Sequence, residues 1–215
     1  MPKILVLFHS RTGNTAALAE AIAEGARGVR FTEVDIRRLE DLAPGELADA
    51  IPAWNEGRGE LARKYRTLDS AERMAEYDGV VIGSPGHFGA MSAELRRVLD
   101  ELGPLASRGG LTDKVGAAFT TALAARGGHE ATLAGMTTAL ASLGMLICPP
   151  GQGEGAKGAG SPLGAIALTG EGGSIGEAEL AIARALGKRV AKVAEWVRHA
   201  KGHEQAGHAH GHHHH

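Results

Sequence analysis

Two patterns of apolar and polar residues follow one another along most of the chain, one typical of strands and one typical of helices. Short runs of consecutive apolar residues, such as Ile4 to Phe8, are typical of strands buried on both faces. Longer stretches between them carry apolar residues at helical spacing. The predicted strands are 3–8, 31–36, 78–83, 115–120 and a fifth strand that is interrupted, at 145–148 and 165–169. The predicted helices are about 14–28, 90–102, 129–143 and a last helix with Ile182, Leu186, Val190, Val193 and Val197 on one face.

The turn after the first strand reads Ser10-Arg11-Thr12-Gly13-Asn14-Thr15 and leads directly into the first helix. Backbone N–H groups at a helix N-terminus point at one spot, and the helix dipole favours an anion there. The three hydroxyl side chains can donate further hydrogen bonds, and Gly13 lets the backbone come close to a ligand. The turn is therefore a candidate phosphate site.

Three kinds of phosphate loop can follow a first strand. The triphosphate loop requires a Lys that this turn lacks. The dinucleotide fingerprint requires three glycines, of which only Gly13 is present, although Asp35 lies roughly where a ribose-binding acid would. The pattern Ser/Thr-x-Thr-Gly-x-Thr is matched at every specified position, and here the chain resembles the flavodoxin-like proteins that bind FMN. A helix cap without a ligand is the remaining alternative.

Strands that alternate with helices predict an α/β fold with a parallel sheet. With this loop, we predict a flavodoxin-like, doubly wound, five-stranded parallel sheet of order 2-1-3-4-5, with helices on both faces. Ligands then bind beyond the carboxyl ends of the strands, so the loops after strands 1, 3 and 4 should form one site. Residues 41–68 are expected to form a loop with short helical pieces near the mouth of a site or an interface.

The loop after the third strand, residues 83–91, places an exposed-looking His87 and Phe88 between glycines. Gly86 and Gly89 permit close backbone approach to a flat ring, while His87 and Phe88 offer contact area. The alternative is a strand-to-helix turn with Phe88 in the core.

The loop after the fourth strand, residues 120–132, is long and consists mostly of small residues. Such a loop can lie along one side of a ring system. It runs into a predicted helix start, where Glu130 suits the helix dipole.

Taken together, the loop motifs are similar to those of the WrbA-type NAD(P)H:quinone oxidoreductases. The motifs are Ser-Pro-x-x-Phe-Gly-x-Met (84–91), Gly-Gly-x-Glu-x-Thr (127–132), Gly-Met (144–145) and Ser-Pro-Leu-Gly-Ala (161–165). The match covers about residues 3 to 198. The resemblance implies non-covalently bound FMN, two-electron reduction of quinones by NAD(P)H, and a homotetramer that can separate into dimers.

Carried over by position, the resemblance implies that Ser10 through Thr15 hold the FMN phosphate. Gly86, His87 and Phe88 would contact the edge of the isoalloxazine ring. The other side of the ring would be lined by Thr121, Ala122, Leu123 and Ala124. No catalytic residue and no metal ligand is assigned; His87 is the best candidate for a proton donor, beside a purely orienting role.

The chain departs from the family at several aromatic and His positions. The family often has a Tyr at Thr12, a Trp about where Ala106 falls, a His at the pair Ser142-Leu143, and a Tyr at Gln152. The resemblance implies that such side chains wall the substrate cavity above the ring. Their replacement leaves FMN binding in place and affects acceptor specificity.

Composition narrows the class of protein. The 215 residues suit one domain, and the formal net charge of −2 provides no basic surface for nucleic acid and no strong acidic field for docking a redox partner. Cys148 is the single cysteine, expected as a buried strand thiol, and no apolar run is long enough to cross a membrane. We therefore expect a cytoplasmic protein with a domain at 1–199 and a disordered His-rich tail at 200–215.

Two alternatives to the quinone oxidoreductase stay open from the sequence. A flavodoxin-like electron carrier would share the phosphate loop, and so would a flavin-binding or scaffold protein without turnover. Both share the predicted fold, so only the chemistry of a bound flavin separates the three.

Overall fold

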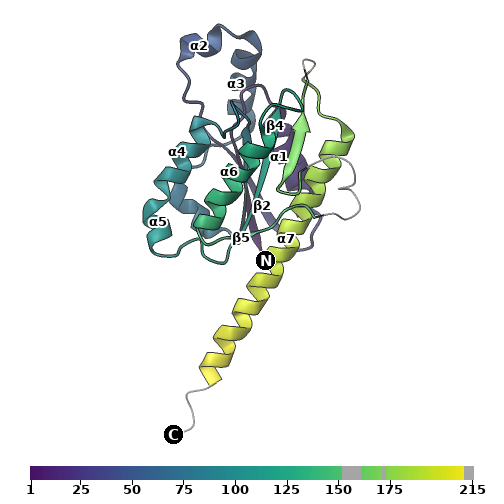
Figure 1. The fold of residues 1–215 in the computed structure, drawn as a ribbon. Coiled ribbons are helices and arrows are strands. Elements are labelled where there is room, and N and C mark those ends of the chain that lie inside the picture. The colour runs from purple at the N-terminus through teal and green to yellow at the C-terminus, as the bar shows by residue number, and fades with distance from the viewer. Residues whose placement is uncertain (152–160, 171–172, 211–215) are drawn as a thin grey trace.

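A computed structural model describes residues 1–151, 161–170 and 173–210 (Figure 1). Its strands form one sheet of order β2-β1-β3-β4-β5, in which all paired strands are parallel. This is the predicted order, and β6 additionally pairs with β4. The strands are β1 (Lys3–Phe8), β2 (Glu33–Arg38), β3 (Gly79–Pro85), β4 (Val115–Ala122), β5 (Leu146–Ile147) and β6 (Ala165–Leu168).

The central strands are buried on both faces. In β1, every residue from Ile4 to Phe8 is inaccessible to solvent, which explains its unbroken apolar run. The edge strand β2 is only half-buried and begins two residues later than expected. The reason is Phe31, whose φ of 60° is incompatible with an extended strand and whose side chain is exposed.

The predicted interruption of the fifth strand is confirmed. The short strand β5 pairs with the start of β4, at Val115 and Gly116. The second piece, β6, pairs with the last four residues of β4, from Phe119 to Ala122. The two pieces therefore extend the same edge of the sheet. Cys148, directly after β5, is buried as expected, and burial raises the pKa of its thiol.

Helices cover both faces of the sheet (Figure 1). One core lies between the sheet and α1 (Asn14–Arg27) and α7 (Glu177–His210). The other lies under the 3₁₀ helix η1 (Ala71–Glu76), α4 (Ala93–Glu101), α5 (Gly103–Ser107) and α6 (His129–Ser142). Helices α1 and α7 cross closely, since a Cβ at Gly187 would lie 1.8 Å from the carbonyl oxygen of Ile22.

The segment between β2 and β3 is more helical than the sequence indicated. It contains α2 (Gly45–Asp49) and the 13-residue helix α3 (Pro52–Lys64), where only short helical pieces were expected. Three glycines and two prolines in this stretch lower its helix propensity. However, Trp54, Gly57 and Leu61 form a buried stripe on α3. Tertiary packing therefore stabilises a helix that propensity alone disfavours.

The last helix extends past residue 199, where the flavodoxin-like domain is predicted to end. Helix α7 continues without a break to His210 and projects beyond the body of the fold (Figure 1). Extending an existing helix costs much less than nucleating one. Residues 211–215 lie outside the described part of the chain.

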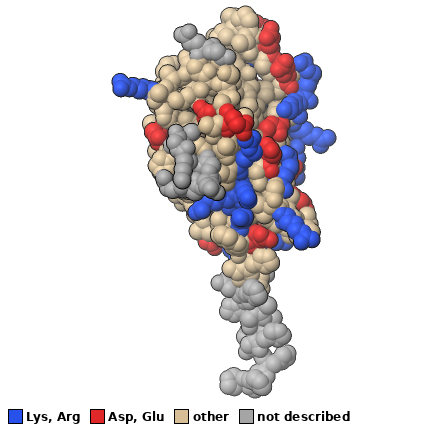
Figure 2. Space-filling view, turned by 90° about the vertical axis from the view of Figure 1, so that its right-hand side faces the viewer, with Lys and Arg blue, Asp and Glu red and all other residues tan. Residues whose placement is uncertain are grey.

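The surface carries both signs of charge. Figure 2 shows Lys and Arg side chains interspersed with Asp and Glu on the face turned to the viewer. Among the described residues, no helix combines the length and the apolarity that a bilayer span needs.

Candidate functional site

The turn from Ser10 to Thr15 connects the end of β1 to the start of α1 at the carboxyl edge of the sheet. Gly13 caps the helix in the left-handed conformation, with φ 97°, and its N–H donates to Ser10 Oγ at 3.1 Å. The first turn of α1 contains no acidic residue. The helix N-terminus is thus left free of a competing carboxylate, as an anion site requires.

The side chains of this turn differ in their exposure. Thr12 is exposed, Arg11 and Asn14 are half-buried, and Ser10 and Thr15 are buried. Thr15 Oγ1 lies 2.9 Å from Thr121 Oγ1, so these hydroxyls bond to each other. If the Thr121 hydroxyl donates this hydrogen bond, the Thr15 hydroxyl can donate its own proton to an oxygen of the ligand.

The loop after β3 forms a tight two-residue turn. The N–H of His87 donates to the carbonyl of Ala90 at 2.9 Å, and the reverse bond measures 3.0 Å. Phe88 and Gly89 at the tip have φ values of 53° and 78°, and the Phe88 side chain is fully exposed. Phe88 is therefore not part of the core, and its left-handed backbone is a strained conformation for an aromatic residue.

The end of β4 is longer than predicted. Thr121 and Ala122 are its last two residues and are buried, whereas Leu123 and Ala124 are exposed in the loop that follows. We had expected Thr121 and Ala122 to lie in that loop, but β6 supplies partners that extend the ladder, and Thr169 N–H also bonds to the Ala122 carbonyl.

The three loops are in direct contact with one another. The N–H of Gly86 donates to the carbonyl of Thr121 at 2.8 Å. A Cβ at Gly128 would lie 2.6 Å from Gly89 Cα, so the loops after β3 and β4 touch backbone to backbone. Together with the Thr15–Thr121 bond, these contacts bring all predicted site residues to one edge of the sheet.

This arrangement fits FMN. A terminal phosphate needs several neutral donors and no carboxylate in the first turn of the helix, which the Ser10–Thr15 turn and α1 provide. Among the described residues, Arg11 Nε is a buried N–H without a hydrogen-bond partner, and it belongs to the same turn. A flat ring needs close backbone approach and exposed apolar contact area, which Gly86, Phe88 and Leu123 provide.

Two of the positions at which the chain departs from the family, Ala106 and Ser142, do not lie at the predicted flavin site. Ala106 is in α5 and Ser142 ends α6, which leads into β5 through Gly144. The carbonyl of Gly144 accepts from Asp113 N–H, two residues before β4 begins. Both positions therefore lie at the amino edge of the sheet, and within one chain they do not wall the predicted site. The third departure, Gln152, is outside the described residues.

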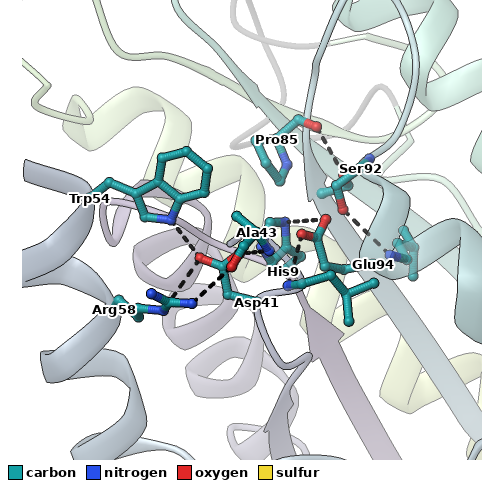
Figure 3. A network of polar contacts seen from close by, with 11 residues as sticks. His9, Asp41, Ala43, Trp54, Arg58, Pro85, Ser92 and Glu94 are labelled. Carbon is teal, nitrogen blue, oxygen red and sulfur yellow. Dashed lines mark hydrogen bonds and ion pairs between the residues drawn. The ribbon is translucent and has the colours of Figure 1, made fainter. Parts of the chain in front are cut away.

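The sequence did not reveal a buried polar network beside the turn from Ser10 to Thr15, which we call the phosphate turn (Figure 3). His9 is inaccessible to solvent, and its Nδ1 lies 3.4 Å from Glu94 Oε2. Burial lowers the pKa of His9 to about 4, although the nearby Glu94 carboxylate acts in the opposite direction. Burial is the main reason why the pKa of His87 is also lowered, with the Arg11 cation second. Both imidazoles are neutral at neutral pH.

Helix α3 supports the phosphate turn from outside the sheet. The Arg11 guanidinium stacks 4.0 Å from the centre of the buried Trp54 ring. A Cβ at Gly57 would lie 2.4 Å from the carbonyl oxygen of Arg11, so the α3 backbone packs directly on the turn. The sequence feature that could have indicated this contact is Trp54, a large aromatic residue within an otherwise polar stretch.

A model of the NADPH-dependent FMN reductase family matches residues 2–158. The chain belongs to this family. It is 38% identical to an "NAD(P)H dehydrogenase (quinone)" of Chromohalobacter salexigens over 202 residues, which cover 90% of this chain and 98% of that one. It is 39% identical to a protein of the same name from Archaeoglobus fulgidus over 195 residues, 91% of this chain and 98% of the relative. The resemblance to the WrbA-type proteins is thereby confirmed.

Solved structures share the fold of this family member. A "flavodoxin, WrbA-like protein" from Agrobacterium tumefaciens superposes with a TM-score of 0.61 at 22% identity, covering 91% of this chain and 99% of that one. A flavodoxin from the domain Archaea has a TM-score of 0.56 at 18% identity and covers 90% and 99%. The flavodoxin-like fold is therefore confirmed.

Proposed function

We propose that this protein is an FMN-dependent oxidoreductase that transfers two electrons from NAD(P)H to quinones. The observation that carries the proposal is the joining of three loops at the carboxyl edge through Thr15, Thr121, Gly89 and Gly128. Family membership and relatives named NAD(P)H dehydrogenase (quinone), of which the chain covers nearly the whole length, support the same reaction.

In this proposal the residues from Ser10 to Thr15 hold the phosphate of FMN, and Arg11 offsets part of its charge. Gly86, His87 and Phe88 contact one edge of the ring, and the segment from Thr121 to Ala124 lines the other side. The flavin, when bound, accepts a hydride from the nicotinamide and passes two electrons to the acceptor.

The chain's own contribution is to bind, orient and shield. The neutral His87 imidazole can hold one hydrogen bond at the ring edge without adding a positive charge. Phe88 and Leu123 present exposed apolar surface, which suits flat rings such as nicotinamide and quinone. One open site of this kind serves both substrates in turn.

The test is an absorbance spectrum of the purified protein before and after NADPH, and again after a quinone. The expected result is a flavin spectrum that NADPH or NADH bleaches and that quinone restores. A bound flavin that neither nucleotide reduces would overturn the proposal. Build-up of one-electron-reduced flavin during a slow reductive titration would instead indicate an electron carrier, and failure to take up added FMN would indicate a scaffold protein.

We further propose a cytoplasmic homotetramer or homodimer with the flavodoxin-like unit spanning residues 1–199. The position of Ala106 and Ser142 at the far edge of the sheet supports association, because such positions can reach a substrate cavity only from another copy. Light scattering of the FMN-loaded protein is the measurement; a monomer at all concentrations would contradict it.

A further inference from the structure

His9, Asp41 and Glu94 come from three separate segments and meet beneath the phosphate turn (Figure 3). His9 directly follows β1, Asp41 begins the excursion that contains α2 and α3, and Glu94 lies in the first turn of α4. Each offers one nitrogen or oxygen atom, and these three atoms lie within 4.8 Å of one another. His9 is fully buried and Glu94 is 4% exposed.

Two of the three side chains in this cluster, His9 and Glu94, carry buried atoms that lack hydrogen-bond partners. Among the described residues, both ring nitrogens of His9 and Glu94 Oε2 are buried without one. Leaving a buried polar group unpartnered costs about 1–3 kcal/mol, more if the group is charged. The orphaned His9 Nδ1 and Glu94 Oε2 lie 3.4 Å apart, which indicates that a shared partner belongs beside both atoms.

Groups outside the cluster hold one oxygen of Glu94 and both oxygens of Asp41 in place. Glu94 Oε1 accepts from the N–H of Leu42 at 3.3 Å, which turns Oε2 toward His9. Asp41 Oδ1 accepts from the N–H of Ala43 at 2.9 Å, and Oδ2 accepts from the indole N–H of Trp54. Outer partners of this kind orient metal-binding carboxylates and imidazoles in proteins.

The spacing and charge suit a divalent metal ion. His9 Nδ1 and Glu94 Oε2 are 3.4 Å apart, and bond lengths to Zn²⁺ of about 2.0–2.2 Å place two tetrahedral ligands about 3.4 Å from each other. Arg58 Nε lies 3.9 Å from Asp41 Oδ2 and offsets part of one negative charge. Among the described residues, Glu94 has only the neutral His9 within ion-pair distance.

We propose that His9, Asp41 and Glu94 form a binding site for a divalent transition-metal ion, with Zn²⁺ as the ion that best matches one imidazole and two carboxylates. The bound ion links the end of β1, the α2–α3 excursion and the start of α4. It is a structural site, because the three ligands come from the segments that surround the phosphate turn, with His9 and Glu94 buried and Asp41 partly buried.

The experiment must separate this site from the His-rich C-terminus. All titrations therefore use the full-length chain in which His203, His208, His210 and His212 to His215 are replaced by Ala, after treatment with a chelator. Zn²⁺ is titrated calorimetrically, and thermal unfolding is followed with and without Zn²⁺. The expected result is one bound Zn²⁺ per chain and a higher Tm, because an ion that binds the folded state stabilises it.

Single substitutions in that background assign the ligands. Glu94→Gln and Asp41→Asn should each weaken Zn²⁺ binding by about 100-fold or more, since even loss of an outer partner costs about 10–100-fold. Glu101→Gln, at the exposed end of the same helix α4, is the matched control and should bind as the parent does. Equal affinity in all variants, or no binding by the parent at millimolar Zn²⁺, would overturn the proposal. If Glu94→Gln does not fold, Asp41→Asn decides, because the single Asn oxygen can still accept one of the two hydrogen bonds, from Ala43 or from Trp54.

Discussion

Thr15 and Thr121 are 106 residues apart in the chain, yet their hydroxyl oxygens lie 2.9 Å apart in the buried space beneath the site. Thr15 belongs to the phosphate turn, and Thr121 is close to the end of β4. Thr121 also accepts from Gly86 through its carbonyl. One residue thus connects the phosphate turn to both loops that are proposed to hold the ring.

Replacing Thr15 by Val should loosen this connection. The substitution preserves shape but leaves the buried Thr121 hydroxyl without its partner, at a cost of about 1–3 kcal/mol in the free energy of unfolding. Thr15→Ser keeps the hydroxyl and is the control. Urea unfolding measures the difference, and equal unfolding free energies for Val and Ser variants would show that the bond contributes nothing.

A negative charge in the phosphate turn should prevent FMN from being retained. Thr12→Glu introduces a carboxylate at an exposed position of the turn, where it repels the phosphate dianion. Thr15→Glu should do the same, but Thr15 is buried, so this variant also loses folding stability. Flavin content after purification is the measurement. The control is Thr112→Glu, an exposed position just before β4, and this variant should retain FMN. If the Thr12→Glu protein still purified with stoichiometric FMN, the phosphate assignment would be wrong.

Gly128→Ala should disturb the contact between the two ring loops. The new Cβ would lie 2.6 Å from Gly89 Cα, and the φ of 79° costs a residue with a side chain about 1–2 kcal/mol by itself. We expect a lower urea midpoint and weaker FMN binding. Gly45→Ala is the control, because a Cβ there meets no atom within 4 Å; a Gly128→Ala protein as stable as this control would contradict the close approach.

Stability should fall at high pH because of Tyr77. Burial and the hydrogen bond that Tyr77 donates to Asp35 Oδ2, at 2.7 Å, raise the pKa of Tyr77 to about 12. Since the pKa in the unfolded chain is about 10, this contribution is complete below pH 10 and is lost as the pH rises through 12. Tyr77→Phe should abolish that part of the pH dependence.

The ultraviolet absorbance of tyrosinate follows this titration directly. The chain has two tyrosines, so Tyr77→Phe leaves only Tyr65, whose pKa burial also raises. Tyr65→Phe is the matched variant and should retain the step near pH 12. A wild-type protein in which both tyrosines titrate near pH 10 would contradict the buried hydrogen bond.

Local sequence patterns predicted the features that depend on neighbouring residues. The apolar run of β1, the glycine and hydroxyls of the phosphate turn, and the alternation of strands with helices sufficed to predict the sheet order. They also led to the proposal that the site lies at the carboxyl edge. The same patterns could not predict α3, because its helix is stabilised by burial of Trp54 and Leu61 against distant segments.

The sequence by itself determined the fold class, the family resemblance and the three loops that we propose to bind FMN, because each is encoded in contiguous residues. Only the tertiary structure decided that Thr15 meets Thr121, that Ala106 and Ser142 lie at the opposite edge, and that His9, Asp41 and Glu94 share one buried cluster. These relationships join residues far apart in the chain, and their positions follow from strand register and helix packing rather than from any local pattern.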